Sequence, residues 1–317
     1  MTAEKLPSPL TDPALETGWR TKDGLRCAAA IYRGSPVQDA ESGSSTRPPI
    51  VCLHGLTRNS ADFEGVARIL TGRGHTVYAL TFRGRGQSDW DRNYRNYHPA
   101  QYRDDVLAAL DAFDIERAAF IGTSLGGIVT MLIAATKPDR IECAVINDVG
   151  PQLAPEGLAR IGALLADRTD TNGHAKPMTP ETSFDAALAT IKRHNVPAFP
   201  DADETFWRAF TKRTHRQQED GVWTPDYDSG IARALVELGA GDDLQPAFES
   251  LAQKPLMLIR GAISDLMTDD IAHAMKKSAP HLVDISIPRI GHAPMLDEPE
   301  SIAALTDFLD KAAAEGV

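Results

Sequence analysis

Residues 118–135 of this chain read AAFIGTSLGGIVTMLIAA, in which a serine stands between two glycines. The four apolar residues that open the stretch are typical of a buried strand, and the segment after the glycines has helical periodicity. Gly122 and Gly126 lie two residues on either side of Ser124, and glycine tolerates backbone conformations that other residues avoid. The stretch therefore predicts a strand, a sharp turn and a helix, with Ser124 raised at the turn as a candidate nucleophile.

Short apolar runs of the same kind alternate with amphipathic helical segments along much of the chain. The other runs fall at residues 50–53, 76–80, 143–146, 255–259 and 283–287. Strands that are almost wholly apolar and alternate with helices are typical of a parallel sheet covered on both faces. The sequence thus predicts an α/β fold with a mostly parallel central sheet. A hairpin at 19–33, turning at Asp23-Gly24, is expected to precede it.

This alternation lapses between residues 151 and 251. That part of the chain shows helical periodicity and proline-rich polar connectors, without a strong strand pattern. We expect a helical cap at 151–251, inserted between an N-terminal part of the core at 1–150 and a C-terminal part at 252–317. Ligands of open α/β sheets bind at the carboxyl ends of the strands, so we place the cap over that edge.

The composition limits the classes of partner. Lys and Arg number 33 against 44 Asp and Glu, a formal net charge of −11, which argues against nucleic acid. Residues 1–18 lack the apolar core of a signal peptide, and no apolar run is long enough to span a membrane. The 3 cysteines are too few for a disulfide framework. We expect a cytoplasmic protein that acts on a small molecule, with no membrane partner; the oligomeric state is left open.

A serine hydroxyl needs a general base before it can act as a nucleophile at neutral pH. His292 follows the last apolar run, where a loop would return to the sheet edge that carries Ser124. Asp265 follows the run before that one and is expected to orient the imidazole of His292. Asp148 follows the run just before the cap and would end at the same edge. It remains the alternative carboxylate.

Two further sets of residues are candidates for the site. The backbone amides of Leu56 and Leu125 are expected to form an oxyanion hole. Arg83 and several large cap side chains are candidates for a substrate pocket, the latter being Met178, Phe206, Trp207, Phe210, Trp223 and Tyr227. The histidines show no ligand spacing with acids or cysteines, and no glycine-rich loop fits a nucleotide fingerprint. We expect neither a metal nor a cofactor.

Five short motifs stand in order along the chain. They are His54-Gly55, Phe82-Arg83-Gly84-Arg85-Gly86-Gln87-Ser88, Gly122-Thr123-Ser124-Leu125-Gly126-Gly127, Ser264-Asp265 and Gly291-His292. Together they resemble the α/β-hydrolase superfamily over 50–146 and 255–309, and the segment between resembles the helical cap of many members. The resemblance implies a carboxylesterase-like member with a serine nucleophile and the chain order Ser, Asp, His. Dehalogenase and epoxide-hydrolase members carry Asp as nucleophile, so those activities are disfavoured.

These residues and the resemblance predict a serine hydrolase that cleaves a carboxylic ester through an acyl-enzyme. Ring-cleavage hydrolases of the superfamily use the same triad to break a carbon–carbon bond of a diketone, and lactone hydrolysis is a further alternative. A non-catalytic ligand-binding protein on this fold is disfavoured, because a binder does not need all three triad residues in register.

Overall fold

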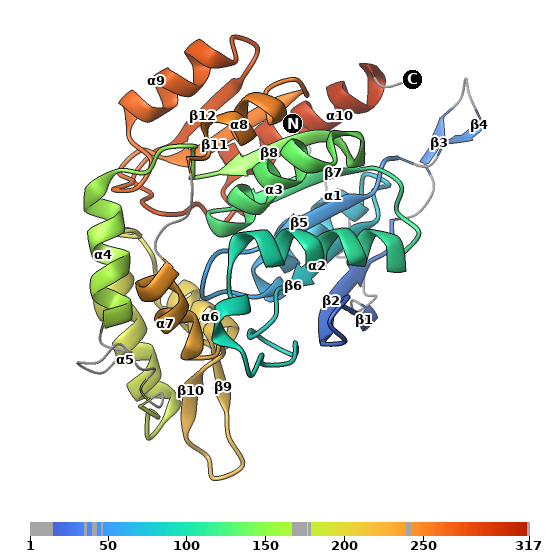
Figure 1. Cartoon of the computed structure of the whole chain (residues 1–317). Coiled ribbons are helices and arrows are strands. Elements are labelled where there is room, and N and C mark those ends of the chain that lie inside the picture. Colours follow the sequence, from blue (N-terminus) through green and yellow to red (C-terminus); the bar gives the residue numbers. More distant parts are fainter. Residues whose placement is uncertain are drawn as a thin grey trace, which may run out of the picture.

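A computed structural model describes residues 15–34, 37–39, 43–45, 47–166, 176, 179–238 and 243–315. Its centre is an eight-stranded sheet in the order β1-β2-β6-β5-β7-β8-β11-β12 (Figure 1). The strands are β1 (Leu15–Arg20), β2 (Arg26–Tyr32), β5 (Ile50–Leu53), β6 (Val77–Thr81), β7 (Ala118–Thr123), β8 (Ile141–Asn147), β11 (Leu256–Gly261) and β12 (Val283–Ile287). From β6 to β12 all neighbours pair in parallel, which confirms the predicted α/β sheet.

The first two strands form the antiparallel hairpin that the sequence predicts, although it begins at Leu15 rather than Trp19. Its turn includes Gly24 with a φ of 90°, a conformation that favours glycine. The hairpin joins the sheet through β2, which pairs antiparallel with β6. A separate pair of short strands, β3 (Val37–Asp39) and β4 (Gly43–Ser45), follows the hairpin.

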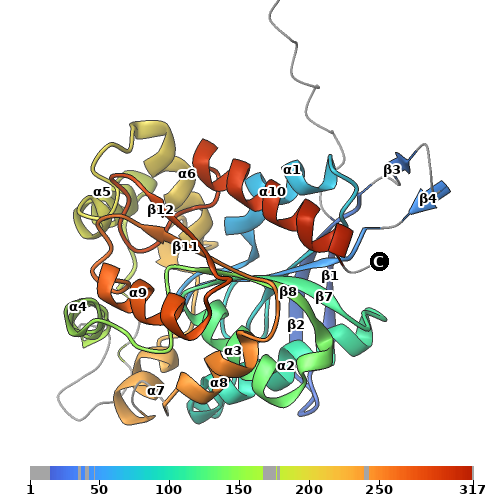
Figure 2. The same cartoon turned by 90° about the horizontal axis from the view of Figure 1, so that it is seen from above.

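Helices cover both faces of the sheet (Figure 2). One face carries α1 (Glu64–Thr71) and α10 (Pro299–Glu315), and the other carries α2 (Pro99–Ala112), α3 (Leu125–Thr136), α8 (Gln245–Leu251) and α9 (Asp269–Ser278). Each face has its own cluster of buried apolar side chains. Strands covered on both sides need apolar residues at every position, which is why β5 is buried throughout.

The segment between β8 and β11 holds the cap elements. They are α4 (Pro155–Ala166), α5 (Phe184–Asn195), α6 (Glu204–Thr214), β9 (His215–Gln217), β10 (Trp223–Pro225) and α7 (Gly230–Leu238). The four cap helices gather on one side of the molecule in both views (Figures 1 and 2). The β9–β10 hairpin was not expected, because two strands of three residues are too short to show an alternating pattern. Helix α8 lies within the predicted cap limits of 151–251 but packs on α3 of the core. These limits stay a prediction.

Short 3-10 turns complete the chain at η1 (Ser60–Phe63), η2 (Tyr94–Asn96) and η3 (Pro138–Arg140). All three cysteines, Cys27, Cys52 and Cys143, are free and buried. Among the described residues, no helix combines the length and the apolar character that a membrane span requires.

Candidate active site

Ser124 occupies the turn between β7 and α3, with a φ of 51° and a ψ of −115°. Such a conformation is strained for a residue with a side chain, and strain of this kind concentrates at functional sites. A Cβ atom at Gly122 would lie 2.6 Å from the carbonyl oxygen of Gly126. A Cβ atom at Gly126 would collide with the carbonyl oxygen of Leu53 on the neighbouring strand. Both glycines are therefore needed for the helix to start this close to the sheet.

His292 lies in the loop after β12, and its Nε2 atom is 3.0 Å from the Oγ atom of Ser124. The loop is fastened to the sheet edge by Asn147, the last residue of β8. The Asn147 side-chain amide donates to the carbonyl oxygen of Pro294 at 2.8 Å and to the Thr123 hydroxyl at 3.0 Å. Asn147 thus holds the histidine loop beside the nucleophile turn. This role of Asn147 was not predicted from the sequence.

The carboxylate that contacts His292 belongs to Asp148. Its Oδ2 atom lies 2.7 Å from Nδ1 of His292, and the side chain is fully buried. Two more groups donate to this carboxylate, both from the segment that ends and follows β11: the Gly261 amide at 2.8 Å and the Ser264 hydroxyl at 2.7 Å. A buried carboxylate needs such partners. They leave Asp148 in one position, facing the imidazole.

Asp265 instead points to the cap, and this corrects the expectation that it orients His292. Its carboxylate accepts from Nε and Nη2 of Arg160 on α4, at 2.5 and 2.9 Å. The hydrogen bonds from Arg160 hold the pKa of Asp265 below its usual value. The physical reason lies in the sheet order: β8 is the direct neighbour of β7, whereas β11 is one strand further away. The first carboxylate after β8 therefore ends nearer to Ser124, to which His292 is hydrogen-bonded.

The loop after β5 lies beside the nucleophile, as an oxyanion hole requires. A Cβ atom at Gly55 would be 3.7 Å from Cβ of Ser124. Leu125 is the first residue of α3, and amides in the first turn of a helix have no partner within the helix. Within the described parts of the chain, neither the Leu56 amide nor the Leu125 amide donates to another protein group. Both remain candidates for the role.

His54 holds this loop in place through both of its ring nitrogens. Its Nδ1 atom lies 2.7 Å from the Gly55 carbonyl oxygen, and its Nε2 atom accepts from the Phe82 amide at 3.0 Å. The ring is fully buried, and burial lowers its pKa to about 3. His54 is thus neutral and held at both nitrogens, so it supports the loop and is not placed to act as a base.

A cavity of about 210 Å³ lies between the core and the cap, and Ser124 and His292 line it. Of the predicted pocket residues, Phe210 and Tyr227 line this cavity. Further apolar lining comes from Leu56, Phe63, Ile161, Leu164, Leu165, Ile191, Phe199 and Met295, and polar lining includes Arg58, Asp62, Arg160, Thr190, His194 and Asn195. Helical periodicity on α4 was visible in the sequence, but periodicity does not tell which side chains face a cavity.

The other predicted pocket residues lie elsewhere. Phe206 and Trp207 pack against each other in the apolar cluster of the cap, with ring centroids 5.1 Å apart. Trp223 packs on Phe184, with centroids 5.0 Å apart. Phe206, Trp207 and Trp223 do not line the cavity. They pack against other aromatic side chains within the cap instead. Met178 lies outside the described residues.

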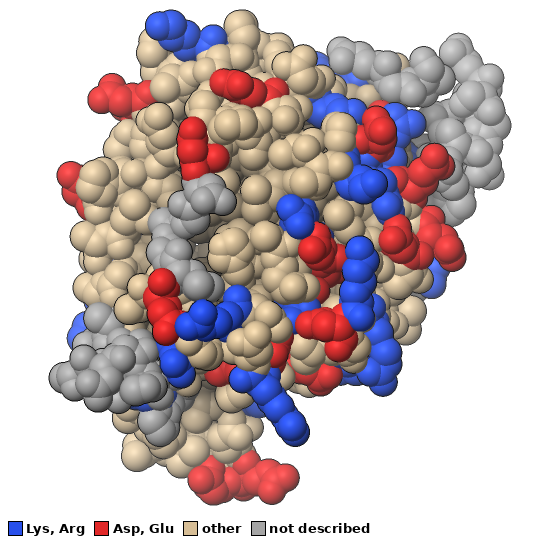
Figure 3. All heavy atoms as spheres, in the orientation of Figure 1, with Lys and Arg blue, Asp and Glu red and all other residues tan. Residues whose placement is uncertain are grey.

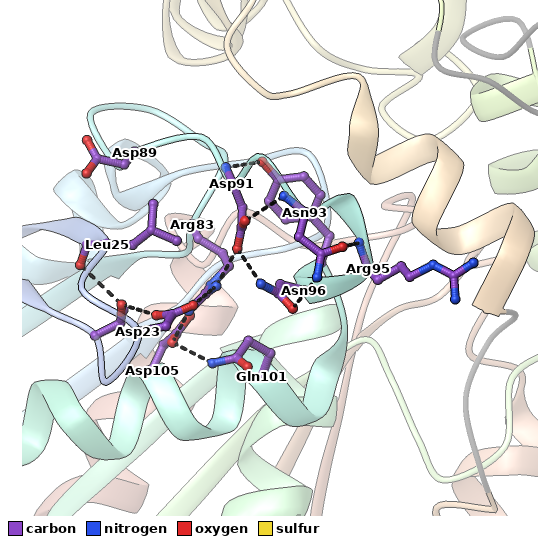
Figure 4. Close-up of polar contacts among 12 residues, drawn as sticks. Asp23, Leu25, Arg83, Asp89, Asp91, Asn93, Arg95, Asn96, Gln101 and Asp105 are labelled. Atoms are coloured by element: carbon purple, nitrogen blue, oxygen red, sulfur yellow. Dashed lines mark hydrogen bonds and ion pairs between the residues drawn. The ribbon is translucent and has the colours of Figure 1, made fainter.

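Arg83 is also absent from the cavity wall, since it is completely buried in an ion-pair cluster (Figure 4). Its guanidinium donates to Asp105 through Nε and Nη2, both at 2.6 Å, to Asp91 at 2.6 Å and to Asp23 at 2.8 and 3.0 Å. Burial acts to lower the pKa of Arg83, but the hydrogen bonds that it donates to Asp105 and Asp23 outweigh burial and raise the pKa. Arg83 therefore joins the N-terminal hairpin to α2.

The described residues contain no group of three or more His, Cys, Asp or Glu side chains placed to hold a metal ion. What the site does contain is a serine, a histidine and an aspartate in a continuous line of hydrogen bonds, on an α/β sheet beneath a helical cap. Fold and site together are those of a hydrolase built on an α/β core.

Comparison with known proteins gives the family. Residues 48–299 match the family model described as the alpha/beta hydrolase fold, and the chain belongs to this family. It is 31% identical over 278 residues to a 3-hydroxybutyrate-oligomer hydrolase of Cupriavidus necator, covering 84% of this chain and 90% of the relative. It is 29% identical over 271 residues to a 2-(acetamidomethylene)succinate hydrolase of Mesorhizobium japonicum, covering 85% and 90%.

A solved structure of an alpha/beta hydrolase from Novosphingobium aromaticivorans is similar over nearly the whole chain. The two share 39% of their residues, with a TM-score of 0.82, and the match covers 94% of this chain and 99% of that one. The likeness extends through both the core and the cap segment.

Proposed function

We propose that this protein is a serine hydrolase that cleaves a small carboxylic ester through an acyl-enzyme. The observation that carries the proposal is the line of hydrogen bonds from Ser124 through His292 to Asp148, which opens on the cavity beneath the cap. A nucleophile within reach of a base, with the base oriented by a third group, is the arrangement that activates a serine hydroxyl.

In the first half of the reaction, Nε2 of His292 takes the proton of the Ser124 hydroxyl as its oxygen attacks the ester carbonyl. The negative charge that forms on the carbonyl oxygen is stabilised by the amides of Leu56 and Leu125. When the tetrahedral intermediate collapses, the bond to the alcohol breaks and His292 gives its proton to the leaving oxygen. Asp148 holds Nδ1–H of the imidazole and stabilises the imidazolium while it exists.

In the second half, His292 takes a proton from a water molecule, and the resulting hydroxide attacks the acyl carbon. Collapse of this second intermediate breaks the bond to Ser124, which recovers its proton from His292. The products are an alcohol and a carboxylic acid, and the enzyme returns to its starting state. These steps need neither a metal nor an organic cofactor.

Two observations support an ester of modest size. The cavity of about 210 Å³ is smaller than the roughly 300–1,000 Å³ of most ligand pockets. The related proteins described above are named as hydrolases, and one of them acts on oligomers of 3-hydroxybutyrate, whose units are joined by ester bonds. No feature of the described residues favours a diketone or a lactone over an ester.

The proposal is tested with a fluorophosphonate probe and a substrate panel. We expect the probe to label the wild-type protein at Ser124 and to leave the Ser124→Ala variant unlabelled. We expect p-nitrophenyl esters of short acids to be cleaved faster than lactones or dienoate diketones. Folded wild-type protein that neither reacts with the probe nor cleaves any ester would overturn the proposal.

A further inference from the structure

Two arginines line the cavity, and an aspartate holds each of them in the same way. Arg58 donates to Asp62 through Nε and Nη2 at 2.6 and 2.5 Å. Arg160 donates to Asp265 through the same two atoms, at 2.5 and 2.9 Å. A guanidinium has five N–H donors, and in both residues the Nη1 group has no hydrogen-bond partner among the described parts of the chain. Each arginine is fixed along one edge and keeps donors on the other.

The two arginines differ in the position of the opposite charge. Asp62 lines the cavity together with Arg58, so that pair presents both signs to a ligand. Asp265 does not line the cavity, so Arg160 presents its positive charge there and has its counterion on the side away from the ligand space. The hydrogen bonds that Arg160 donates to Asp265 raise the pKa of Arg160 further above its usual value. Its side chain is 41% exposed and therefore accessible.

The charged side chains that line the cavity are net positive, in contrast to the protein as a whole, which is acidic. The whole chain has a formal net charge of −11, and on the face drawn in Figure 3 basic and acidic side chains are interspersed without a large patch of one sign. Of the described residues that line the cavity, the permanently charged ones are Arg58, Asp62 and Arg160. The Arg160 side chain is 41% exposed, so its guanidinium is open to an anionic ligand in the cavity.

We propose that Arg160 binds a carboxylate of the substrate, and that the enzyme prefers esters which carry a free carboxylate beside the bond that is cleaved. This inference rests on the proposed ester hydrolysis and names the substrate class of the same site. The ligand carboxylate pairs with the Nη1 side of the guanidinium, while Asp265 holds the opposite edge. Arginine is well suited to this task because its planar fork matches a carboxylate. Asp265 is thus a positioning residue for Arg160.

The names of two relatives agree with such a substrate. An oligomer of 3-hydroxybutyrate and a succinate derivative both carry carboxylate groups by their chemistry. A linear 3-hydroxybutyrate oligomer combines an ester bond with a terminal carboxylate four atoms or fewer from it, which suits a small cavity. The dimer of 3-hydroxybutyrate is accordingly the probe that we choose for this chain.

The test compares the 3-hydroxybutyrate dimer with its terminal carboxamide, which has nearly the same size and no charge. We expect wild-type kcat/KM to be at least about ten-fold higher for the acid, since hydrogen bonds to charged groups contribute more than neutral ones. In Arg160→Gln this ratio should fall at least about ten-fold, mainly through KM, and Arg160→Lys should restore part of it. Asp265→Asn should lower the ratio less than Arg160→Gln does.

Arg208→Gln is the matched control. Arg208 lies on cap helix α6 and pairs with Asp185 at 3.7 Å, away from the cavity wall. We expect this variant to keep the wild-type ratio of acid to carboxamide. A wild-type enzyme that cleaves both dimers equally well, or an Arg160→Gln variant with an unchanged ratio, would overturn the inference while leaving ester hydrolysis in place.

A binding measurement separates this inference from the proposed chemistry. In Ser124→Ala protein, calorimetric titration should show tighter binding of the acid dimer than of the carboxamide, and adding Arg160→Gln should remove the difference. Equal binding of the two ligands to Ser124→Ala contradicts the carboxylate site. If the preference is present but no ester is ever cleaved, the proposed function is wrong and the carboxylate site remains.

Discussion

The hydroxyl of Ser264 donates to Oδ2 of Asp148 at 2.7 Å, the same oxygen that faces Nδ1 of His292. The Ser264 oxygen in turn accepts from the amides of Leu266 and Met267, at 3.2 and 3.1 Å. The loop after β11 thereby helps to hold the carboxylate in place. This loop also contacts the cap, because the Gly157 amide of α4 donates to the Asp265 carbonyl oxygen at 2.9 Å.

Removing the Ser264 hydroxyl should therefore slow the reaction without weakening substrate binding. We expect Ser264→Ala to lower kcat about ten-fold, as hydrogen bonds to charged groups contribute roughly 1.5–3 kcal/mol, with KM changed little. Ser264→Thr should restore most of the loss. Ser250→Ala is the control, since among the described residues the Ser250 hydroxyl bonds only to the Pro246 carbonyl of its own helix. A loss confined to KM, or no rescue by threonine, would speak against a positioning role.

Two glycine substitutions should have opposite effects on stability. A Cβ atom at Gly126 would collide with the Leu53 carbonyl, so we expect Gly126→Ala to lower the free energy of unfolding by roughly 3 kcal/mol or more. Gly162 lies inside α4 with nothing within 4 Å of its Cβ position. Gly162→Ala should raise stability by up to about 1 kcal/mol, because alanine favours the helix. Thermal unfolding of both variants decides this, and a soluble Gly126→Ala protein with the wild-type Tm would be inconsistent with the turn described.

Arg83 should matter for stability rather than for substrate binding. In Arg83→Gln the buried side chains of Asp105 and Asp91 lose their counterion, and breaking a buried ion pair this way destabilises by roughly 3–5 kcal/mol. Urea unfolding measures the loss, and KM of the folded fraction should stay within about two-fold. Arg95, whose side chain is 62% exposed, provides the control variant Arg95→Gln with near wild-type stability. A raised KM at unchanged stability would place Arg83 at the substrate instead.

His54 should make the protein sensitive to acid. Burial lowers its pKa in the folded state to about 3, against the ordinary value of 6.5. Between these two values the unfolded chain binds a proton that the folded protein does not, so stability falls as the pH drops from 6.5 toward 3. The slope from one such group approaches about 1.4 kcal/mol per pH unit. We expect His54→Gln to show a shallower fall in urea unfolding from pH 7 to 4.5; equal slopes in both proteins would contradict this.

The fold was predictable because its strands are short, apolar and buried on both faces. The runs at 50–53 and 118–121 correspond closely to β5 and β7. The turn that carries Ser124 was predictable from Gly122 and Gly126, because glycine is needed where the helix starts this close to the sheet. The β9–β10 hairpin could not be found, since Trp223–Pro225 is too short to show alternation. Its position depends on contacts with the rest of the cap.

The choice between two carboxylates depended on tertiary structure. Asp148 and Asp265 both follow strands that end at the same edge and both lie between Ser124 and His292 in the chain, and the family resemblance favoured Asp265. In the structure Asp148 contacts His292, whereas Asp265 pairs with Arg160 of the cap, a partner that the sequence does not reveal. Similarly, Phe210 lines the cavity whereas Phe206, four residues earlier on the same helix, does not. Helical spacing alone does not separate them.

The most direct test of the triad compares Asp148→Asn with Asp265→Asn on one uncharged p-nitrophenyl ester. If Asp148 orients His292, kcat of Asp148→Asn should fall by about 10³-fold or more. The imidazole would no longer be held in the tautomer that can accept the Ser124 proton, and the imidazolium would lose the negative charge that stabilises it. Asp265→Asn should lose no more than about ten-fold on this ester, since its carboxylate contacts Arg160. A large loss in Asp265→Asn with Asp148→Asn still active would contradict the account.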